Sequence, residues 1–125
     1  MDATTLVVGA GRGLGRAIAV AFAEADTSVV AVARTKLDLV DLAAHAQVRT
    51  EVADATDSST ARRLLATYEP QMCILVAGAA PVSRPLQEHT WETFSVNWHV
   101  DVRMTFECCA KRCSCRCVRG AGSSW

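Results

Sequence analysis

The chain has 125 residues, half of them hydrophobic, and its 13 basic and 13 acidic residues give a formal net charge of zero. This length suits one small globular domain, and the balanced charge gives no reason to expect nucleic acid or an anionic membrane as a partner. No apolar run reaches the roughly 20 residues of a membrane span, and Asp2 stands where a signal peptide would be basic. We therefore expect a cytoplasmic protein.

The segment from Leu6 to Ile18 organises the rest of the chain. An apolar run ends at Val8, and glycines then occupy the alternate positions Gly9, Gly11, Gly13 and Gly15. Apolar residues follow at helical spacing, so the segment predicts a strand, a glycine turn and a helix that ends near Ala25. Glycines allow close approach of a ligand, and the free N–H groups at a helix start favour phosphate. A glycine turn that binds nothing is the alternative.

The later elements alternate between strand and helix. We expect strands at 28–33, 48–52 and 72–76, and helices over about 37–46, capped by Thr35, and after 57–58, where Asp57 or Ser58 is the cap. From Thr90 onward, a long amphipathic helix is predicted by the spacing of Trp91, Phe94, Trp98, Val102 and Phe106. This alternation is typical of βαβ units, so the fold class is α/β with a parallel sheet.

The glycine spacing has a specific parallel. Gly9-x-x-x-Gly13-x-Gly15 resembles the T-G-x-x-x-G-x-G motif of the short-chain dehydrogenase/reductase family, with Val8 in place of Thr. Asp54 after the third strand and Ala77-Gly78 after the fourth extend the resemblance, which covers about 4–106, although Val76 replaces an Asn. The resemblance implies a Rossmann-like doubly wound sheet, incomplete at about four strands in the order 3-2-1-4, and an NAD(P)-binding half domain over 1–106.

The resemblance also implies the cofactor contacts. A basic residue after the second strand pairs with the extra phosphate of NADP, whereas an acid there would bind the ribose of NAD. Ala33 stands in the place of the acid, Arg34 follows it, and guanidinium groups match phosphate well, so NADP is expected rather than NAD. The cofactor-binding residues so implied are Gly9, Arg12, Gly13, Leu14, Gly15, Arg34, Asp54, Ala77 and Gly78.

The function implied is hydride transfer between a nicotinamide and a carbonyl or alcohol substrate, but the catalytic residues of the family are missing. The family uses a Ser and a Tyr-x-x-x-Lys pair, whereas Tyr68 is the single tyrosine and Met72 stands four residues after it. Asp101 occupies the position of an Asn that organises the proton relay, and Asn97 lies one turn earlier. Whether the chain is an enzyme stays open. A catalytically inactive nucleotide-binding or interaction fragment is the alternative, followed by a thiol-rich metal-binding protein.

The last segment, 107–125, is rich in Cys and Arg and is expected to be irregular. Its pattern C-C-x-x-x-C-x-C-x-C lacks the paired C-x-x-C of structural zinc sites, so no metal ligands are predicted. We favour a chain truncated by a change of reading frame after about Phe106. Without a fifth strand, the fourth would form an open sheet edge, which predicts marginal stability and self-association or a homo-oligomer.

Overall fold

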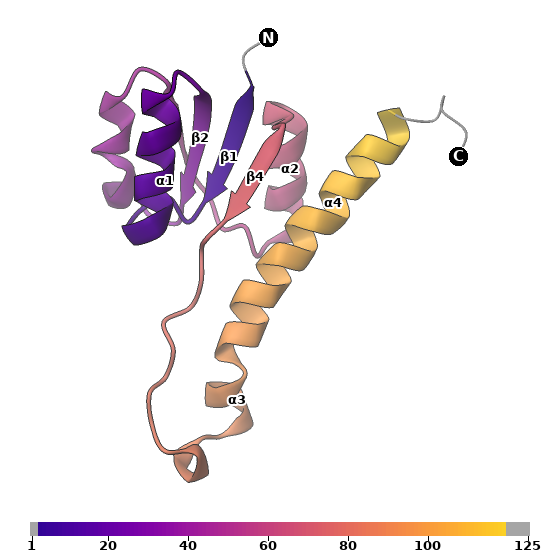
Figure 1. The fold of residues 1–125 in the computed structure, drawn as a ribbon. Helices are drawn as coiled ribbons and strands as arrows, with labels where there is room; N and C mark the ends of the chain where they lie inside the picture. Colours follow the sequence, from indigo (N-terminus) through magenta and orange to yellow (C-terminus); the bar gives the residue numbers. More distant parts are fainter. Residues whose placement is uncertain (1–2, 120–125) are drawn as a thin grey trace.

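A computed structural model describes residues 3–119, with side chains described through Arg112. Its four strands form one parallel sheet in the order β3-β2-β1-β4, and the central strand β1 places Val7 between Ala31 of β2 and Ile74 of β4. This confirms the predicted α/β class and strand order (Figure 1). The strands are β1 (Thr4–Val8), β2 (Ser28–Ala33), β3 (Val48–Val52) and β4 (Met72–Leu75).

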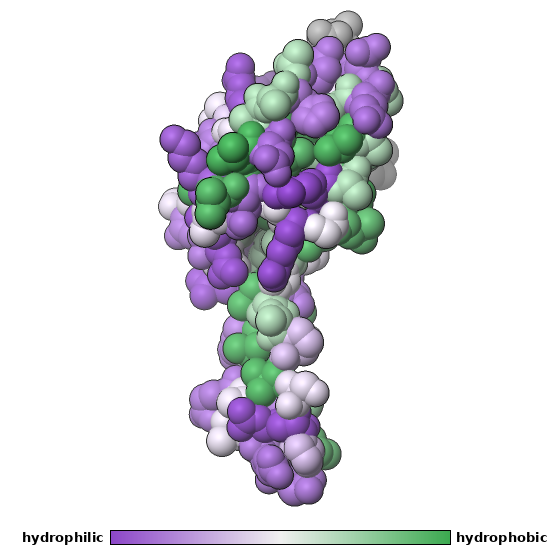
Figure 2. All heavy atoms as spheres, turned by 90° about the vertical axis from the view of Figure 1, so that its left-hand side faces the viewer, coloured by the Kyte–Doolittle hydropathy of each residue, from purple (hydrophilic) through white to green (hydrophobic). Residues whose placement is uncertain are grey.

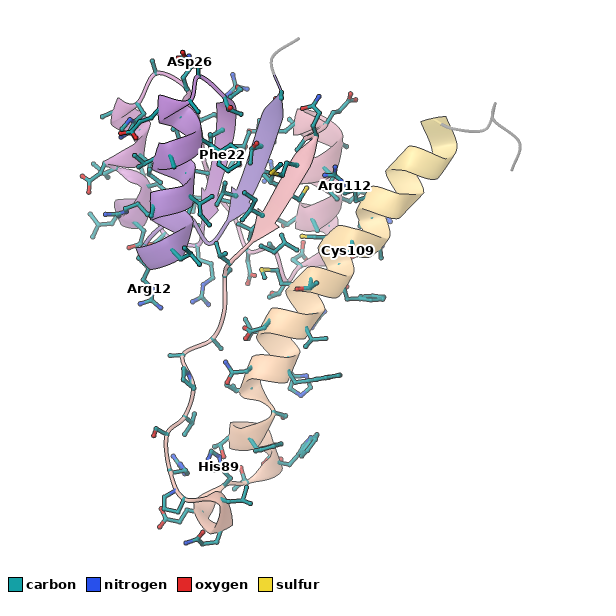
Figure 3. The ribbon with its side chains drawn as sticks, in the orientation of Figure 1. Arg12, Phe22, Asp26, His89, Cys109 and Arg112 are labelled. Atoms are coloured by element: carbon teal, nitrogen blue, oxygen red, sulfur yellow. The ribbon has the colours of Figure 1, made fainter. Side chains whose placement is uncertain are left out.

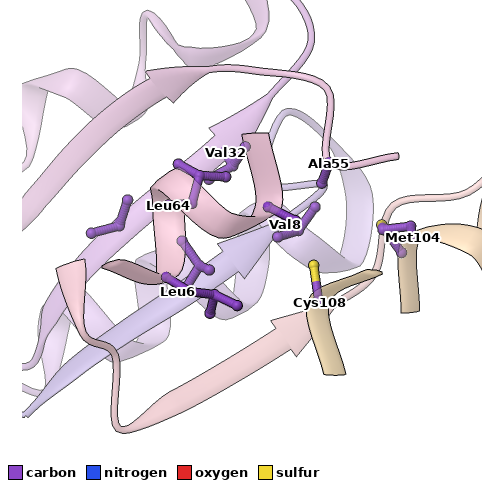
Figure 4. Close-up of a cluster of buried hydrophobic side chains, with 10 residues drawn as sticks. Leu6, Val8, Val32, Ala55, Leu64, Met104 and Cys108 are labelled. Atoms are coloured by element: carbon purple, nitrogen blue, oxygen red, sulfur yellow. The ribbon is translucent and has the colours of Figure 1, made fainter. Parts of the chain in front are cut away.

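Helices cover both faces of the sheet, because successive strand residues point to opposite sides. Helix α1 (Gly13–Glu24) covers one face, where Val7 and Ala31 are buried together with Ala19. Helix α2 (Ser58–Tyr68) and helix α4 (Arg103–Arg119) cover the other face (Figure 1). The core on that second face includes Leu6, Val8, Val32, Ala55, Leu64, Met104 and Cys108 (Figure 4).

The start of α2 agrees with the prediction. Asp57 is the N-cap, and its carboxylate accepts a hydrogen bond from the Thr60 amide at 2.7 Å. The helix ends at Tyr68, where Glu69 takes a left-handed conformation with φ of 43° and Pro70 follows. Proline cannot continue a helix, so the chain turns here into β4.

The helix predicted over 37–46 is wrong. Two single 3₁₀ turns, Leu37–Leu39 and Leu42–Ala44, take its place, and Thr35 donates its hydroxyl to the Asp38 carboxylate instead of capping a helix. A guanidinium N–H of Arg16 donates a hydrogen bond to the Asp38 carbonyl at 2.9 Å. In the expected α-helix, this carbonyl would accept from a backbone amide of the helix. Only Leu39 and Leu42 are buried here, and their spacing of three residues matches a 3₁₀ helix.

The long helix predicted from Thr90 forms, but it is interrupted at Ser95 and its geometry is not α-helical throughout. Helix α3 (Trp91–Phe94) is followed by a π-helical turn, Trp98–Val102, and then by α4. The hydroxyl of Thr105 donates to the Asp101 carbonyl at 2.9 Å beside that turn. The segment before α4 lies beyond the end of the sheet, so it has little core to pack on (Figure 1).

The apolar positions of this region face outward. We call Trp91, Phe94, Trp98, Val102 and Phe106 the apolar stripe; these side chains are 42–69% exposed. The buried residues of the region are instead Ser95, Met104 and Cys108. The predicted periodicity is therefore real, but it does not mark the face that packs on the sheet.

The irregular structure expected from residue 107 is wrong as far as the structure describes the segment, because α4 is helical through Arg119. Met104 and Cys108 anchor the helix in the core, and adding a residue to an existing helix is far easier than starting one. The expectation for 120–125 lies outside the described residues, and the proposed change of reading frame stays a prediction.

The outer surface has two further features. Within residues 3–119, β4 pairs with β1 alone, so its other edge has no strand beside it. No helix in this range is long and apolar enough to cross a membrane. The side of the molecule that carries α1 mixes hydrophilic and hydrophobic residues over a rounded body, above a narrower lower part (Figure 2).

Candidate functional site

The glycine turn joins β1, α1 and the chain after β4 at distances that exclude side chains. Gly9 has a φ of 90°, and a Cβ there would lie 2.6 Å from the Cα of Ala77 and closer still to its amide nitrogen. A Cβ on Gly15 would overlap the carbonyl oxygen of Gly9. The amides of Gly9 and Ala10 donate to the Val32 carbonyl at 2.9 and 3.0 Å. The turn is thus fixed against β2, α1 and the residues that follow β4.

Gly13 differs from these packed glycines. Its φ is 54°, yet no atom lies within 4 Å of a Cβ built on it, so the turn is open at this point. Gly13 begins α1, and the first amides of a helix have no acceptor inside the helix. Arg12 is the N-cap residue without a side-chain capping bond, and the first turn carries no acid. Open space, free donors and a helix dipole therefore meet at a position suited to an anion.

Arg12 and Leu14 border this opening, and both are exposed. Figure 3 shows the Arg12 side chain at the start of α1, near the end of the sheet where the strands terminate. A guanidinium in that position can reach a bound phosphate without leaving the protein surface.

Arg16 is a residue of the turn that the sequence reasoning missed. Its guanidinium donates to the carbonyl of Gly11 at 2.7 Å and forms an ion pair with Asp41 at 3.4 Å. Together with the bond to Asp38, these contacts hold the glycine turn against the segment after β2. The sequence contains one sign of this role: Arg16 is the only charged residue of α1 before Glu24.

Arg34 and Asp54 lie at the carboxyl ends of the neighbouring strands β2 and β3. Thr56 donates both its hydroxyl and its amide to Asp54 Oδ1, at 2.7 and 3.0 Å. These bonds lower the pKa of Asp54, the hydroxyl bond most, and the positive charge of Arg34 lowers it further. Both side chains are exposed. Within the described residues no hydrogen bond uses Asp54 Oδ2, which can still accept one from a ligand.

The residues after β4 are held from the start of the helical region. Asp101 Oδ1 accepts a hydrogen bond from the Ala79 amide at 2.9 Å. Asn97 Nδ2 donates to the Ala79 carbonyl at 2.7 Å. Ala77 and Gly78 therefore lie between the glycine turn and these two side chains. The bond from Asn97 was not predicted, although its place near Asp101 was.

Tyr68 lies away from this arrangement. It ends α2 near the first residues of the strands, and its hydroxyl donates to the Glu51 carboxylate. Burial and this bond raise the pKa of Tyr68. A hollow of about 450 Å³ at this opposite end is lined by polar groups that include Arg49 and Tyr68. The expectation that Tyr68 does not act as the family's catalytic tyrosine fits this position.

The cysteines whose side chains are described gather where α4 meets β4. Arg112 donates to Cys73 Sγ at 2.7 Å, and Figure 3 shows Arg112 and Cys109 on α4 beside that strand. Burial raises the pKa of Cys108 to about 11. Among the residues the structure describes, no three His, Cys, Asp or Glu side chains are arranged to hold a metal ion.

Comparison with known proteins identifies the family. The sequence model of the short chain dehydrogenase family matches residues 3–121. L-xylulose reductase of Mesocricetus auratus is 32% identical over 103 residues, and carbonyl reductase [NADPH] 2 of Sus scrofa is 31% identical over 103 residues. Each match covers 82% of this chain and 42% of the relative, so the chain spans less than half the length of these relatives.

A solved structure agrees with the sequence matches. A short-chain dehydrogenase from Streptomyces avermitilis superposes with a TM-score of 0.77 at 27% identity, over 95% of this chain and 46% of that one. Residues 3–121, which the family model matches, contain the four strands and the glycine turn described above. The chain therefore belongs to the short-chain dehydrogenase family.

Proposed function

We propose that the chain is the cofactor-binding part of an NADP-preferring oxidoreductase that transfers hydride between a nicotinamide and a carbonyl or alcohol. The observation that carries the proposal is the opening at Gly13, where free amides at the start of α1 face unfilled space beside Arg12. In a parallel α/β sheet, ligands bind outside the carboxyl ends of the strands. Arg34, Asp54 and Ala77 lie just after the carboxyl ends of β2, β3 and β4.

The residues present fit a dinucleotide. The amides of Leu14 and Gly15 would hold the diphosphate, with Arg12 as a neighbouring cation. Asp54 would accept a hydrogen bond from the adenine amino group. The backbone of Ala77 and Gly78 would hold the ribose on the nicotinamide side, next to Gly9.

A preference for NADP is supported by charge. Arg34 is exposed at the end of β2, and the preceding residue, Ala33, carries no carboxylate that would repel a phosphate. A guanidinium binds a phosphate through two parallel hydrogen bonds, which an adenosine hydroxyl cannot match. The name of the relative carbonyl reductase [NADPH] 2 agrees with this preference.

The reaction itself is a proposal for a whole protein. When bound, the nicotinamide supplies the hydride donor or acceptor, and the chain's own residues would position it. No Ser and Tyr-x-x-x-Lys set follows β4 in this sequence. A catalytically inactive nucleotide-binding or interaction fragment is therefore the second candidate, and the engagement of Tyr68 with Glu51 favours it.

The proposal is tested by fluorescence titration with NADPH. Gly13→Asn fills the opening with a side chain that tolerates a positive φ, so the fold should survive while affinity falls at least tenfold. Arg34→Glu should weaken NADPH binding at least tenfold without weakening NADH, because an acid at this position can accept hydrogen bonds from the ribose hydroxyls of NADH. Matched controls are Ala17→Asn on the exposed side of α1 and Arg62→Glu on α2. Unchanged affinity in both test variants would overturn the proposal.

Turnover separates the two candidates. Activity of this chain with NADPH against a panel of carbonyl substrates would exclude a fragment that only binds nucleotide. Self-association through the open edge of β4 and a cytoplasmic location complete the proposal.

A further inference from the structure

The side chain of Asp101 does more than accept one hydrogen bond. A Cβ on Gly78 would lie 3.1 Å from Asp101 Oδ1 and 3.5 Å from Oδ2, so both carboxylate oxygens lie against the backbone of Gly78. The same Oδ1 accepts the Ala79 amide. The carboxylate is therefore packed directly behind the residues that follow β4.

These residues are continuous with the glycine turn. Ala77 is so close to Gly9 that only glycine fits there, and Asn97 fixes the carbonyl of Ala79 from the other side. The half-buried Asp101 is thus held on one side of a short, fixed stretch of backbone whose neighbour is the candidate cofactor site.

Asp101 takes part in no ion pair among the side chains that the structure describes. The ion pairs found there are Arg16 with Asp41 and Arg63 with Glu51. The bond to the Ala79 amide does not require a charge, because an asparagine oxygen is also an acceptor. The resemblance to the family places an asparagine here, so the charge is what this sequence adds.

A charge beside a nicotinamide distinguishes the two redox states of the cofactor. The oxidised ring carries a positive charge and the reduced ring is neutral, whereas the rest of the dinucleotide is the same. An unpaired negative charge in a half-buried position attracts the oxidised ring, and the attraction is stronger there than in water.

We propose that Asp101 is a specificity-determining residue that makes the site favour NADP⁺ over NADPH. The inference rests on the proposed function, because it assumes that a dinucleotide lies against Ala77 and Gly78. It assigns to Asp101 a role in cofactor selection, whereas Asn97 serves only to position the backbone.

The test compares dissociation constants for both redox forms, with calorimetry for NADP⁺ and fluorescence for NADPH. Asp101→Asn keeps the acceptor and removes the charge, so we expect NADP⁺ to bind about tenfold more weakly while NADPH is unchanged. Asn97→Ala should weaken both forms by the same factor. Glu92→Gln, an exposed carboxylate on α3, is the matched control and should change neither.

The outcomes separate this inference from the proposed function. If the unaltered chain binds both forms and Asp101→Asn leaves their ratio unchanged, or weakens both equally, the selection by charge is wrong and the cofactor site stands. If the unaltered chain binds neither form, the proposed function fails and the inference fails with it. Melting curves of each variant establish that the chain remains folded.

Discussion

The sheet with α1 and α2 and the helical region from residue 91 onward obey different rules. In the sheet, the apolar residues of β1 and β2 are buried, and α1 and α2 each bury one face. In the helical region, the apolar stripe is exposed, and the buried contacts come from Met104 and Cys108. Apolar periodicity thus identifies a helix in both regions, but it identifies the packed face only where a sheet lies behind the helix.

The largest effect is expected in the sheet region at Gly9. Gly9→Ala would drive a Cβ into the backbone of Ala77, which cannot yield without separating β1 from the chain after β4. We expect a loss of about 4 kcal/mol or more in the free energy of unfolding, measured with urea. Gly13→Ala is the control: it meets no atom and should cost only about 1–2 kcal/mol for its positive φ. Equal losses at both positions would contradict the packing described.

Truncating one apolar side chain in the sheet region and one in the helical region tests this difference in packing. Leu64→Ala removes a side chain that is 1% exposed in the core under α2, and should cost about 3 kcal/mol. Phe106→Ala removes one that is 65% exposed in the apolar stripe, and should change stability by less than about 0.5 kcal/mol. Urea unfolding at low protein concentration measures both. A Phe106 variant as unstable as the Leu64 variant would mean that the stripe is packed in solution.

A smaller effect is expected at the start of α2. Hydrogen bonds to the Asp57 carboxylate, first from the Ser59 hydroxyl and then from the Thr60 amide, lower its pKa from 3.8 to about 2. Since the folded pKa is the lower one, the stabilisation is present above pH 4 and is lost as the pH falls through 2. Asp57→Ala should lower the Tm by a few degrees at pH 7. The difference in Tm between the unaltered chain and this variant should become smaller as the pH falls.

Asp57→Asn is the matched control for this pH dependence, because asparagine also caps helices but does not titrate in this range. At pH 7, the Tm of Asp57→Asn should lie close to the Tm of the unaltered chain. A gap between the unaltered chain and Asp57→Ala that stays constant from pH 7 to pH 2 would refute the role of the carboxylate.

The smallest effect on stability is expected at the open edge of β4. Met72 is 48% exposed there, and a lysine at a sheet edge discourages pairing with another chain. Met72→Lys should change the free energy of unfolding by less than about 0.5 kcal/mol, yet weaken self-association severalfold in sedimentation velocity. A monomeric unaltered chain at all concentrations would remove the basis for this prediction.

The sequence was sufficient for the sheet and for α1 and α2, but not for the segment 37–46 or for the packing of the helical region from residue 91 onward. Strands such as 28–33 are buried on both faces, so their composition alone predicts them. The helix expected over 37–46 is replaced by two 3₁₀ turns, and Arg16, more than twenty residues away, donates to the Asp38 carbonyl there. The spacing of the apolar stripe predicts a helix but not its burial, because burial depends on where the helix lies relative to the sheet.

The sequence likewise predicts some residues of the candidate site and misses others. The positions Gly9, Gly13 and Gly15 follow from the glycine spacing, and their crowded or open surroundings agree with a turn built for close approach. Their assignment to a cofactor remains a prediction. Arg16 and the bond from Asn97 to Ala79 could not be foreseen, because each contact joins segments whose proximity only the folded chain provides.

The position of β1 between β2 and β4 also bears on synthesis. One side of β1 can pair once residue 33 has left the ribosome, but its other side pairs with 72–75, about forty residues later. At about 5–20 residues per second, that side stays uncovered for roughly 2–8 seconds. During this interval the nascent chain leaves one edge of an inner, buried strand open to chaperones, so its yield in a cell should depend on how quickly translation reaches Leu75.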